Sequence, residues 1–317
     1  MPTDSAQLRQ ILCACMPSIS IDGVAKESGQ RVVYYAHFED QKIPDELLRD
    51  ITSKYLKGWE AWGRVVVKVV SGASTVALTR LQAEASLLEE IQSNQFPRLY
   101  YSNYFSENPV TDEPLQEGLY VSVEEFIDST PLSSVLADFV GKPVEVMKMA
   151  ADIVVGLRPL WEHQRKLVHR DIKPDNLLRA KDGRMVIIDF GIIRETGAVG
   201  LTREGYGQAP VSVGYAAPEQ IANDKDLVSF KTDFFSIGVV MYELISGCHP
   251  FIIKPNMDLM EIVDATENHN PPTLVELGVA NQSQSNLVRD MMNKKPYLRP
   301  RTVDVLIGKM KDAEVMQ

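Results

Sequence analysis

Apolar positions recur along the chain with two different spacings, and the spacing changes near residue 130. In the first part, short runs of β-branched and aromatic residues predict strands. They are residues 19–21, 31–38, 64–70, 96–101 and 119–126. In the second part, helical spacing dominates, with predicted helices at 132–140, 143–164, 230–245 and 302–311. The pattern predicts an α+β protein with a sheet first, helices second and a boundary at 128–131.

Two charged residues interrupt the apolar patterns of the first part. Residues 65–70 are apolar on both faces, as in a buried strand, except for Lys68 in the middle. Residues 75–91 have helical spacing, and their apolar stripe contains Glu84. A buried lysine must find an anion or lose its proton, and a buried carboxylate needs a cation or a hydrogen bond. We therefore expect Lys68 and Glu84 to form an ion pair.

Three more polar groups, Asp171, Asn176 and Asp189, lie among apolar residues of the second part. A Lys-Asp-Gly turn at 181–183 separates two short apolar segments, which predicts a hairpin. The hairpin would place Asn176 just before one strand and Asp189 at the end of its partner. Carboxylate and amide oxygens that converge in this way suit magnesium holding a polyphosphate better than zinc or iron.

These residues resemble the catalytic loop and metal-binding loop of the protein kinases. The shared signatures are the His-Arg-Asp triplet that ends at Asp171, the asparagine five residues later, and the Asp-Phe-Gly triplet that begins at Asp189. Lys173, two residues after Asp171, is typical of serine/threonine kinases rather than tyrosine kinases.

A second segment, residues 213–219, resembles the end of a kinase activation loop, with the sequence Val-Gly-Tyr-Ala-Ala-Pro-Glu. The resemblance covers about residues 20–312 and is to the eukaryotic-like serine/threonine protein kinases, and Gln220 after Pro-Glu favours a bacterial member. It implies a bilobal kinase fold. The N-lobe would be a small antiparallel sheet with one main helix, and the C-lobe would be larger and mainly helical.

The resemblance implies ATP and Mg²⁺ as cofactors and assigns roles to the residues named above. Lys68, fixed by Glu84, would hold the α and β phosphates. Asp171 would orient and deprotonate the acceptor hydroxyl, and Lys173 would neutralise the migrating group. The expected magnesium ligands are Asn176 and Asp189. In this arrangement the triphosphate lies in a cleft between the two lobes.

The same resemblance implies an adenine site around residues 119–126. The backbone carbonyl of Glu124 and the backbone amide of Phe126 would bind the adenine edge. Val123 would guard the pocket behind the ring, and Val66 and Leu178 would lie above and below it.

The nucleotide-covering glycine loop is the largest departure from the family pattern. The family has three glycines here, whereas this chain places only Gly23 and Gly29 in the expected turn between residues 19–21 and 31–38. Backbone contact with phosphate and a plain hairpin turn explain these glycines equally well, and both readings stay open.

The predicted domains are an N-terminal extension at 1–20, an N-lobe at 20–127 and a C-lobe at 128–317. The extension is expected to form a short amphipathic helix. A second helical pattern, at about 43–63, stands where the family has a tight turn, and we interpret it as an insertion.

The resemblance also implies regulation by the activation loop. Arg170 would pair with a phosphate on that loop, and autophosphorylation is expected at Thr202 or Thr196. Both threonines staying unmodified is an equal alternative. Ser212 stands where the family has a threonine that bonds to the catalytic aspartate and lysine.

Two further acids of the C-lobe have expected partners. Asp233, in the first turn of the helix at 230–245, is a candidate N-cap, and in the family this acid holds the backbone of the catalytic loop. Glu219 is expected to pair with Arg299.

Composition narrows the function classes further. The length of 317 residues suits two packed lobes rather than one core. The chain has 43 acids against 33 bases and no apolar run long enough to span a bilayer, so neither nucleic acid nor membrane is an expected partner. Three cysteines without metal spacing and the absence of a secretory signal predict a cytoplasmic protein. The oligomeric state stays unknown.

The sequence therefore predicts a serine/threonine protein kinase that transfers the γ-phosphoryl group of ATP to a protein. A pseudokinase or nucleotide-binding scaffold is an alternative, which the unusual glycine loop favours and the complete set of polar site residues opposes. A small-molecule kinase on the same fold is another. The Ala-Pro-Glu segment and the long activation loop favour a protein substrate.

Overall fold

The computed structural model describes residues 5–28, 31–39, 62–91, 93–189, 194–195 and 213–315. The chain divides into two units. Unit 1 consists of residues 1–92 and 97–127, and unit 2 consists of residues 93–96 and 128–317. The predicted helix at 44–63 lies outside the described residues, apart from its last two positions.

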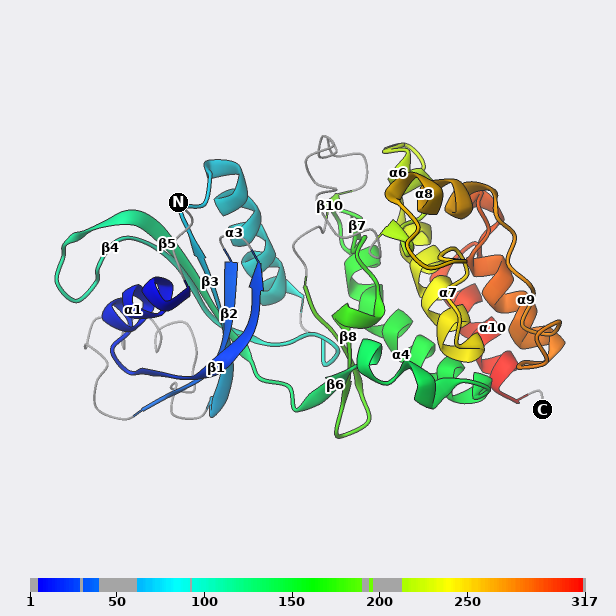
Figure 1. Cartoon of the computed structure of the whole chain (residues 1–317), viewed down its shortest axis with the longest axis horizontal. Helices are drawn as coiled ribbons and strands as arrows, with labels where there is room; N and C mark the ends of the chain where they lie inside the picture. The colour runs from blue at the N-terminus through cyan, green and yellow to red at the C-terminus, as the bar shows by residue number, and fades with distance from the viewer. Residues whose placement is uncertain are drawn as a thin grey trace. The chain divides into compact units, whose positions relative to one another are not determined.

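Unit 1 contains an antiparallel sheet with the strand order β1-β2-β3-β5-β4 and two described helices (Figure 1). The elements in chain order are α1 (Ser5–Cys15), β1 (Ile19–Ser28), β2 (Arg31–Phe38), β3 (Arg64–Ser71), α3 (Thr75–Glu90), β4 (Leu99–Glu107) and β5 (Pro114–Glu125). The strands and the helix at 75–91 that the sequence predicted are present. Strands β1, β4 and β5 are longer than expected, and β4 begins at Leu99 rather than at residue 96.

The sheet is covered on both faces, because alternate residues of each strand point to opposite sides. Val65, Val67 and Val69 of β3 pack in one apolar cluster with Leu8 and Leu12 of α1. The intervening residues of β3 face Leu81, Ala85 and Leu88 of α3 instead. Figure 1 shows α1 and α3 on either side of β2 and β3. The amphipathic helix predicted near the N-terminus is thus confirmed, and it forms part of the unit 1 core.

Gly23 corrects one expectation about the glycine loop. It lies inside β1, opposite Tyr35 of β2, and not in the turn. Register irregularities at Ile21/Gly23 and Val24/Lys26 allow β1 to pass through this region as a bulged strand. The side chain of the neighbouring Asp22 bonds to His37 of β2 at 2.8 Å and so holds the two strands together. Gly29 lies outside the described residues.

Unit 2 is mainly helical (Figure 1). Its helices are α4 (Pro143–Glu162), α6 (Pro218–Ile221), α7 (Phe230–Ser246), α8 (Leu259–Asn268), α9 (Gln282–Met291) and α10 (Val303–Val315). Its short strands are β6 (Ser129–Pro131), β7 (Leu167–Val168), β8 (Leu177–Ala180), β9 (Met185–Ile187) and β10 (Arg194–Glu195). Strands β6, β8 and β9 form one small sheet, and β7 pairs with β10.

The predicted helix at 132–140 is wrong. Two short 3-10 turns, Leu132–Ser134 and Leu136–Phe139, occupy this segment. Val135 between them has φ −131°, which breaks the helical path, and Gly141 follows with φ 72°. The apolar spacing that suggested a helix serves instead to bury Leu132 and Phe139 in the core.

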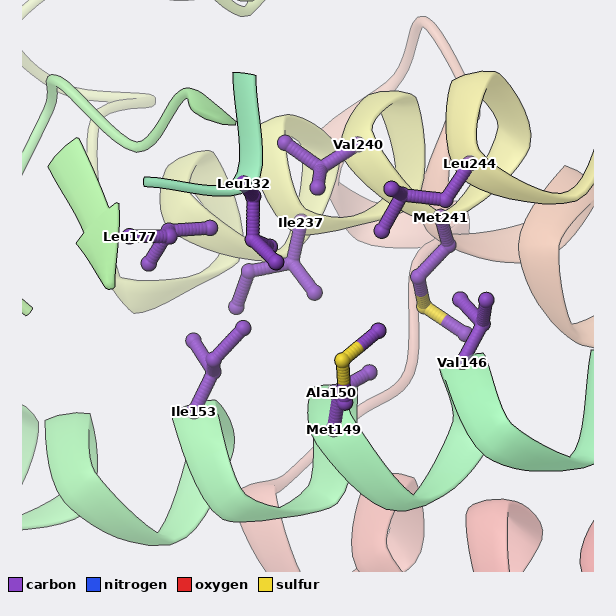
Figure 2. A pocket seen from close by; sticks show the side chains of 10 residues that line it. All are labelled: Leu132, Val146, Met149, Ala150, Ile153, Leu177, Ile237, Val240, Met241 and Leu244. Atoms are coloured by element: carbon purple, nitrogen blue, oxygen red, sulfur yellow. The ribbon is translucent and has the colours of Figure 1, made fainter. Parts of the chain in front are cut away.

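The core of unit 2 lies between α4 and α7. Helix α7 is buried almost all round, as its continuous apolar sequence predicted. Figure 2 shows how side chains from the two helices point toward one another around a small apolar cavity. Helix α7 begins at a capping box formed by Ser229 and Thr232, and it ends at Gly247, whose φ of 76° is left-handed. No helix in the described part of the chain is long and apolar enough to cross a membrane.

Candidate active site

The loop that follows β7 is held by a single buried carboxylate. Asp233 of α7 accepts hydrogen bonds from the backbone amides of His169, at 2.9 Å, and Arg170, at 2.8 Å. It also accepts one from the indole Nε1 of Trp161, at 2.8 Å. Ser229 caps α7, so the expectation that Asp233 is the N-cap is wrong, and its expected hold on the loop backbone is confirmed. Sequence reasoning missed Trp161, which is 72 residues away along the chain.

The hydrogen bonds to Asp233 hold the loop backbone in a conformation that is unusual for a non-glycine residue. Arg170 has φ 69°, in the left-handed region that non-glycine residues seldom adopt. Its carbonyl accepts a hydrogen bond from the side chain of Gln220 at 2.8 Å, another contact that the sequence did not predict. Bonds to its amide and carbonyl together hold this conformation, which turns the next residue, Asp171, into the site.

Asp171 is buried and bound by two neighbours from its own loop. The Nζ atom of Lys173 donates to both carboxylate oxygens, at 2.9 and 2.7 Å. The amide Nδ2 of Asn176 donates to the Asp171 carboxylate at 2.8 Å and to its backbone carbonyl at 2.9 Å. Burial raises the pKa of Asp171, whereas the adjacent Lys173 charge opposes that increase. The structure thus brings together three of the residues that the sequence singled out.

Asn176 and Asp189 are linked through a short hairpin, as predicted. Strands β8 and β9 are paired, with Leu177 opposite Ile187, and the amide of Ile188 donates to the carbonyl of Asn176 at 3.0 Å. Asp189 follows directly, with a left-handed φ of 68°. Its charge adds to the increase in the pKa of Asp171 that burial produces.

The donors of this hairpin fit a hard cation. Both amide protons of Asn176 point at Asp171, which leaves its Oδ1 atom to act as a ligand. Asp189 supplies a carboxylate, and oxygen donors of this kind suit Mg²⁺. Among the described residues, no three His, Cys, Asp or Glu side chains form a metal cage. Two oxygen donors fill only part of the coordination of Mg²⁺, which usually keeps several waters and binds phosphate oxygens.

The second group of site residues lies in unit 1. Lys68 of β3 is 3.7 Å from the Glu84 carboxylate of α3, so the predicted ion pair is present. A closer carboxylate belongs to Glu124 of β5, 2.6 Å from Lys68 Nζ. Sequence reasoning gave Glu124 only a backbone role. One sequence feature could have indicated a side-chain role for Glu124. Ser122 and Glu124 are two polar residues on the same face of a largely apolar strand.

The alternation of β5 corrects the expectation for Val123. Lys68 is opposite Ser122, and Val66 is opposite Glu124, so these four residues share one face of the sheet. Val123 is fully buried on the other face, in the cluster that α1 covers. It therefore cannot guard a pocket on the Lys68 face.

The other residues that the sequence assigned to the adenine site are Phe126, Val66 and Leu178. Phe126 makes an edge contact with the Tyr35 ring at 5.6 Å, and the Arg64 guanidinium lies 4.4 Å from the centre of the Phe126 ring. Val66 of unit 1 is half-buried. Leu178 of unit 2 is also half-buried and pairs with Val186. The regulatory candidates Thr196, Thr202 and Ser212 lie outside the described residues.

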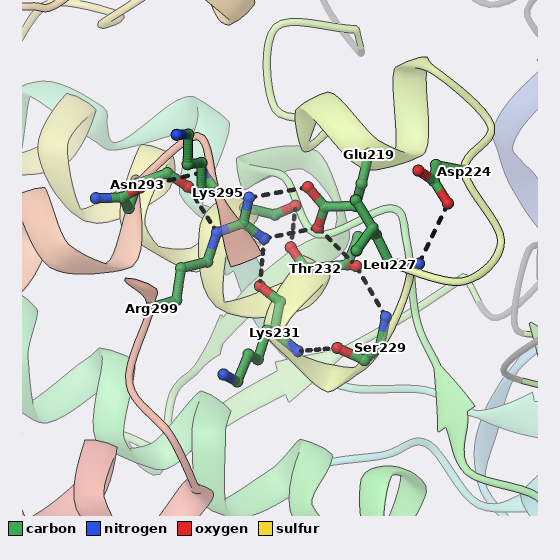
Figure 3. A network of polar contacts seen from close by, with 10 residues as sticks. Glu219, Asp224, Leu227, Ser229, Lys231, Thr232, Asn293, Lys295 and Arg299 are labelled. Carbon is green, nitrogen blue, oxygen red and sulfur yellow. Dashed lines mark hydrogen bonds and ion pairs between the residues drawn. The ribbon is translucent and has the colours of Figure 1, made fainter. Parts of the chain in front are cut away.

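The segment that follows them is anchored by a buried ion pair. Arg299 donates to both oxygens of Glu219, at 2.6 and 2.9 Å, as the sequence predicted. Thr232 Oγ1 donates to the same carboxylate at 2.9 Å, and Arg299 also donates to the backbone carbonyls of Asn293 and Lys231. Figure 3 shows this network, in which side chains from α6, α7 and the segment before α10 meet. It fixes the Ala-Pro-Glu segment to the core of unit 2.

Comparison with known proteins agrees with this geometry. Residues 59–309 match the protein kinase domain family, a match that begins after β1 and β2. The chain is similar to serine/threonine-protein kinase C of Synechocystis sp., with 37% identity over 195 residues, which are 58% of this chain and 33% of that protein. It is also similar to the serine/threonine-protein kinase PknA of Nostoc sp., with 33% identity over 194 residues. That alignment covers 58% of this chain and 31% of the Nostoc protein.

A more distant relative is the serine/threonine-protein kinase PknL of Mycobacterium tuberculosis, with 29% identity over 174 residues. Those residues are 55% of this chain and 40% of PknL. The chain thus spans well under half the length of these relatives. Because the family match covers most of the 317 residues, the chain belongs to the protein kinase domain family.

Proposed function

We propose that this protein is a serine/threonine protein kinase that transfers the γ-phosphoryl group of ATP to a protein hydroxyl. The observation that carries the proposal is the arrangement of Lys173 and Asn176 around the Asp171 carboxylate, at 2.7–2.9 Å. Phosphoryl transfer needs positioned charges more than covalent chemistry, and this group supplies an acceptor for a proton with a cation beside it.

In unit 2, Asp171 accepts a hydrogen bond from the substrate hydroxyl and takes its proton as the oxygen attacks phosphorus. A raised pKa, which burial of Asp171 produces, brings the carboxylate closer to the pKa that an efficient base needs. Lys173 holds the carboxylate in position and offsets the charge of the migrating group. Asn176 and Asp189 would hold Mg²⁺, which when bound neutralises phosphate charge.

In unit 1, Lys68 binds the α and β phosphates, with Glu84 as its positioning partner. The side chain that faces the nucleotide from β5 is Glu124 rather than Val123, given the alternation of the strand. The adenine contacts accordingly shift by one residue from the sequence prediction, to the carbonyl of Glu125 and the amide of Ile127.

Of the two candidate glycines, Gly23 lies too far from the end of β1 to contact phosphate, which leaves Gly29, outside the described residues, as the candidate. Gly23 lies five residues before Ser28, the end of β1. At about 3.3 Å per strand residue, it is roughly 16 Å from that end. Gly23 therefore takes no part in holding the triphosphate.

The proposed substrate class and cellular compartment rest on the Ala-Pro-Glu segment and on the state of the cysteines. The acceptor is a protein, and the anchored Ala-Pro-Glu segment supports this. Autophosphorylation at Thr202 or Thr196 would create a phosphate that pairs with Arg170 and so controls activity. Neither nucleic acid nor membrane is a proposed partner. All three cysteines are free thiols, which supports a cytoplasmic location.

Transfer of labelled γ-phosphate from MgATP to a degenerate serine/threonine peptide library tests the proposal. Purified wild-type protein should label the library, whereas Asp171→Asn and Lys68→Met should lose labelling by at least about a thousandfold. Asp171→Asn should keep a melting temperature close to that of the wild type, and Lys68→Met, which leaves Glu84 and Glu124 without their cation, is compared at a temperature below its own melting transition. Undiminished transfer by Asp171→Asn would rule out the assignment of the base. Nucleotide binding without any transfer by the wild type would favour a pseudokinase.

A further inference from the structure

A polar pocket lies between the sheet of unit 1 and helix α3. It is lined by two basic side chains, Arg31 and Lys68, and by two acidic ones, Glu84 and Glu124, among apolar residues such as Leu81. The acids and bases are equal in number, so the pocket carries no formal net charge when all four are ionised. Both carboxylates nevertheless lie within 4 Å of Lys68 Nζ, although the predicted ion pair with Glu84 needs only one of them.

The two carboxylates hold Lys68 in different ways. Glu124 is 2.6 Å from Lys68 Nζ, and Glu84 is 3.7 Å away. Only 6% of the Glu124 side chain and 8% of the Glu84 side chain are exposed, so water screens neither contact strongly. The shorter contact is the stronger one, because a charge-assisted hydrogen bond needs a separation below about 3 Å.

The sheet itself determines the Glu124 contact. Strands β3 and β5 are hydrogen-bonded neighbours, and Val66, two residues before Lys68 on the same face, is opposite Glu124. Glu84 reaches Lys68 from α3, which is a separate element. A movement of α3 would change the Glu84 distance, whereas the register of the sheet keeps Glu124 within reach of Lys68.

We propose that Glu124 is a positioning residue that competes with the nucleotide phosphates for Lys68 and thereby weakens ATP binding. The inference rests on the proposed function, in which Lys68 binds the α and β phosphates. An ammonium group has three donors, and Glu124 takes one of them in a short contact. The Glu124 charge also opposes a phosphate group at the same ammonium.

Glu124→Gln tests this inference, because glutamine keeps the shape and removes the charge. The variant should bind MgATP and MgADP about tenfold more tightly than the wild type, the change expected when one charge-assisted contact stops competing. The KM for ATP should fall by a similar factor, and kcat should change by less than about twofold. Glu107→Gln, an exposed acid on β4 of the same sheet, is the matched control and should leave both constants unchanged.

Two measurements separate this effect from a merely structural one. Adenosine, which has no phosphate, should bind Glu124→Gln and wild type equally. In a double-mutant cycle, Glu124→Gln should tighten MgADP binding by a clearly smaller factor once Lys68 is replaced by methionine, because only the direct repulsion between Glu124 and phosphate then remains. Glu124→Met gives the same comparisons if Glu124→Gln lacks a cooperative melting transition.

The outcomes are distinct. Unchanged or weaker MgADP binding by a folded Glu124 variant overturns the inference, as does equal tightening for adenosine. Phosphate transfer by the wild type with no tightening in the variant overturns only this inference. Tightening of MgADP in a protein that transfers no phosphate supports the inference and overturns the proposed function.

Discussion

The two groups of site residues are held by different kinds of structure. In unit 2, Asp171 has two side-chain partners, and the loop that carries it is tied by Asp233 through backbone amides. In unit 1, Lys68 lies between two carboxylates at unequal distances. The difference teaches that the loop that carries Asp171 is fixed by several hydrogen bonds at once, whereas Lys68 has two carboxylate partners at different distances, one from the sheet and one from α3.

The largest expected effect concerns the buried ion pair of unit 2. Arg299→Met should lower the free energy of unfolding by about 3–5 kcal/mol, because Glu219 would remain buried without its cation. Urea unfolding followed by circular dichroism measures the loss. Arg289→Met, an exposed position on α9, should cost less than about 0.5 kcal/mol. A loss below about 1 kcal/mol for Arg299→Met would show that the buried contacts of unit 2 contribute no more to stability than those around Lys68 in unit 1.

A slightly smaller effect is expected where the loop that carries Asp171 is bonded to α7. Asp233→Asn replaces one acceptor oxygen by an NH₂ group that faces backbone donors, so about 3 kcal/mol of stability should be lost. Transfer activity should fall with it, since the loop that carries Asp171 loses its support. Asp264→Asn on the exposed side of α8 is the control for the same chemical change. Full transfer activity in Asp233→Asn would show that the site does not depend on the hydrogen bonds between Asp233 and the loop.

Acid should weaken unit 2 through a buried histidine. Burial lowers the pKa of His249 to about 4, so the folded state binds its proton less readily than the unfolded state does. The stability that neutral His249 contributes is present above pH 6.5 and is lost as the pH falls toward 4, with about 2 kcal/mol lost at pH 5.

His249→Gln keeps an acceptor for the backbone amides of Phe251 and Ile252 but does not titrate. The difference in unfolding free energy between wild type and variant should therefore shrink from pH 7 to pH 5. Contributions of other buried groups occur in both proteins and cancel in this comparison. A difference that stays constant with pH would exclude His249 as the source.

The smallest expected effect returns to unit 1. Glu84→Gln should lower stability by less than about 1 kcal/mol, because Lys68 keeps its shorter contact with Glu124. Phosphate transfer should nevertheless decrease, since in the proposed function Glu84 is the partner that orients Lys68 for the nucleotide. Thermal melting and labelled-phosphate transfer measure the two effects. A stability loss as large as that of Asp233→Asn would show that the two carboxylates are not exchangeable partners.

Local sequence patterns were sufficient for much of the fold. Lys68 inside an apolar run identified the buried strand β3, and continuous apolarity identified α7 as a central helix. The turn at 181–183 placed Asn176 and Asp189 on one hairpin. These features are local, because strand alternation, helix periodicity and turn chemistry act over a few residues. Local spacing failed at 132–140, where two short 3-10 turns bury the same apolar residues.

Only the tertiary structure revealed the additional partners of Lys68 and of the loop that carries Asp171. The register between β3 and β5 brought the Glu124 side chain to Lys68 and turned Val123 to the opposite face. Packing of α4 against α7 brought Trp161 to Asp233. A sequence states which residues are adjacent along the chain, whereas strand register and helix packing depend on the summed burial of many distant side chains. For that reason, the residue types of the site and pairs such as Lys68 with Glu84 could be predicted from sequence, whereas the contacts of Glu124 and Trp161 could not.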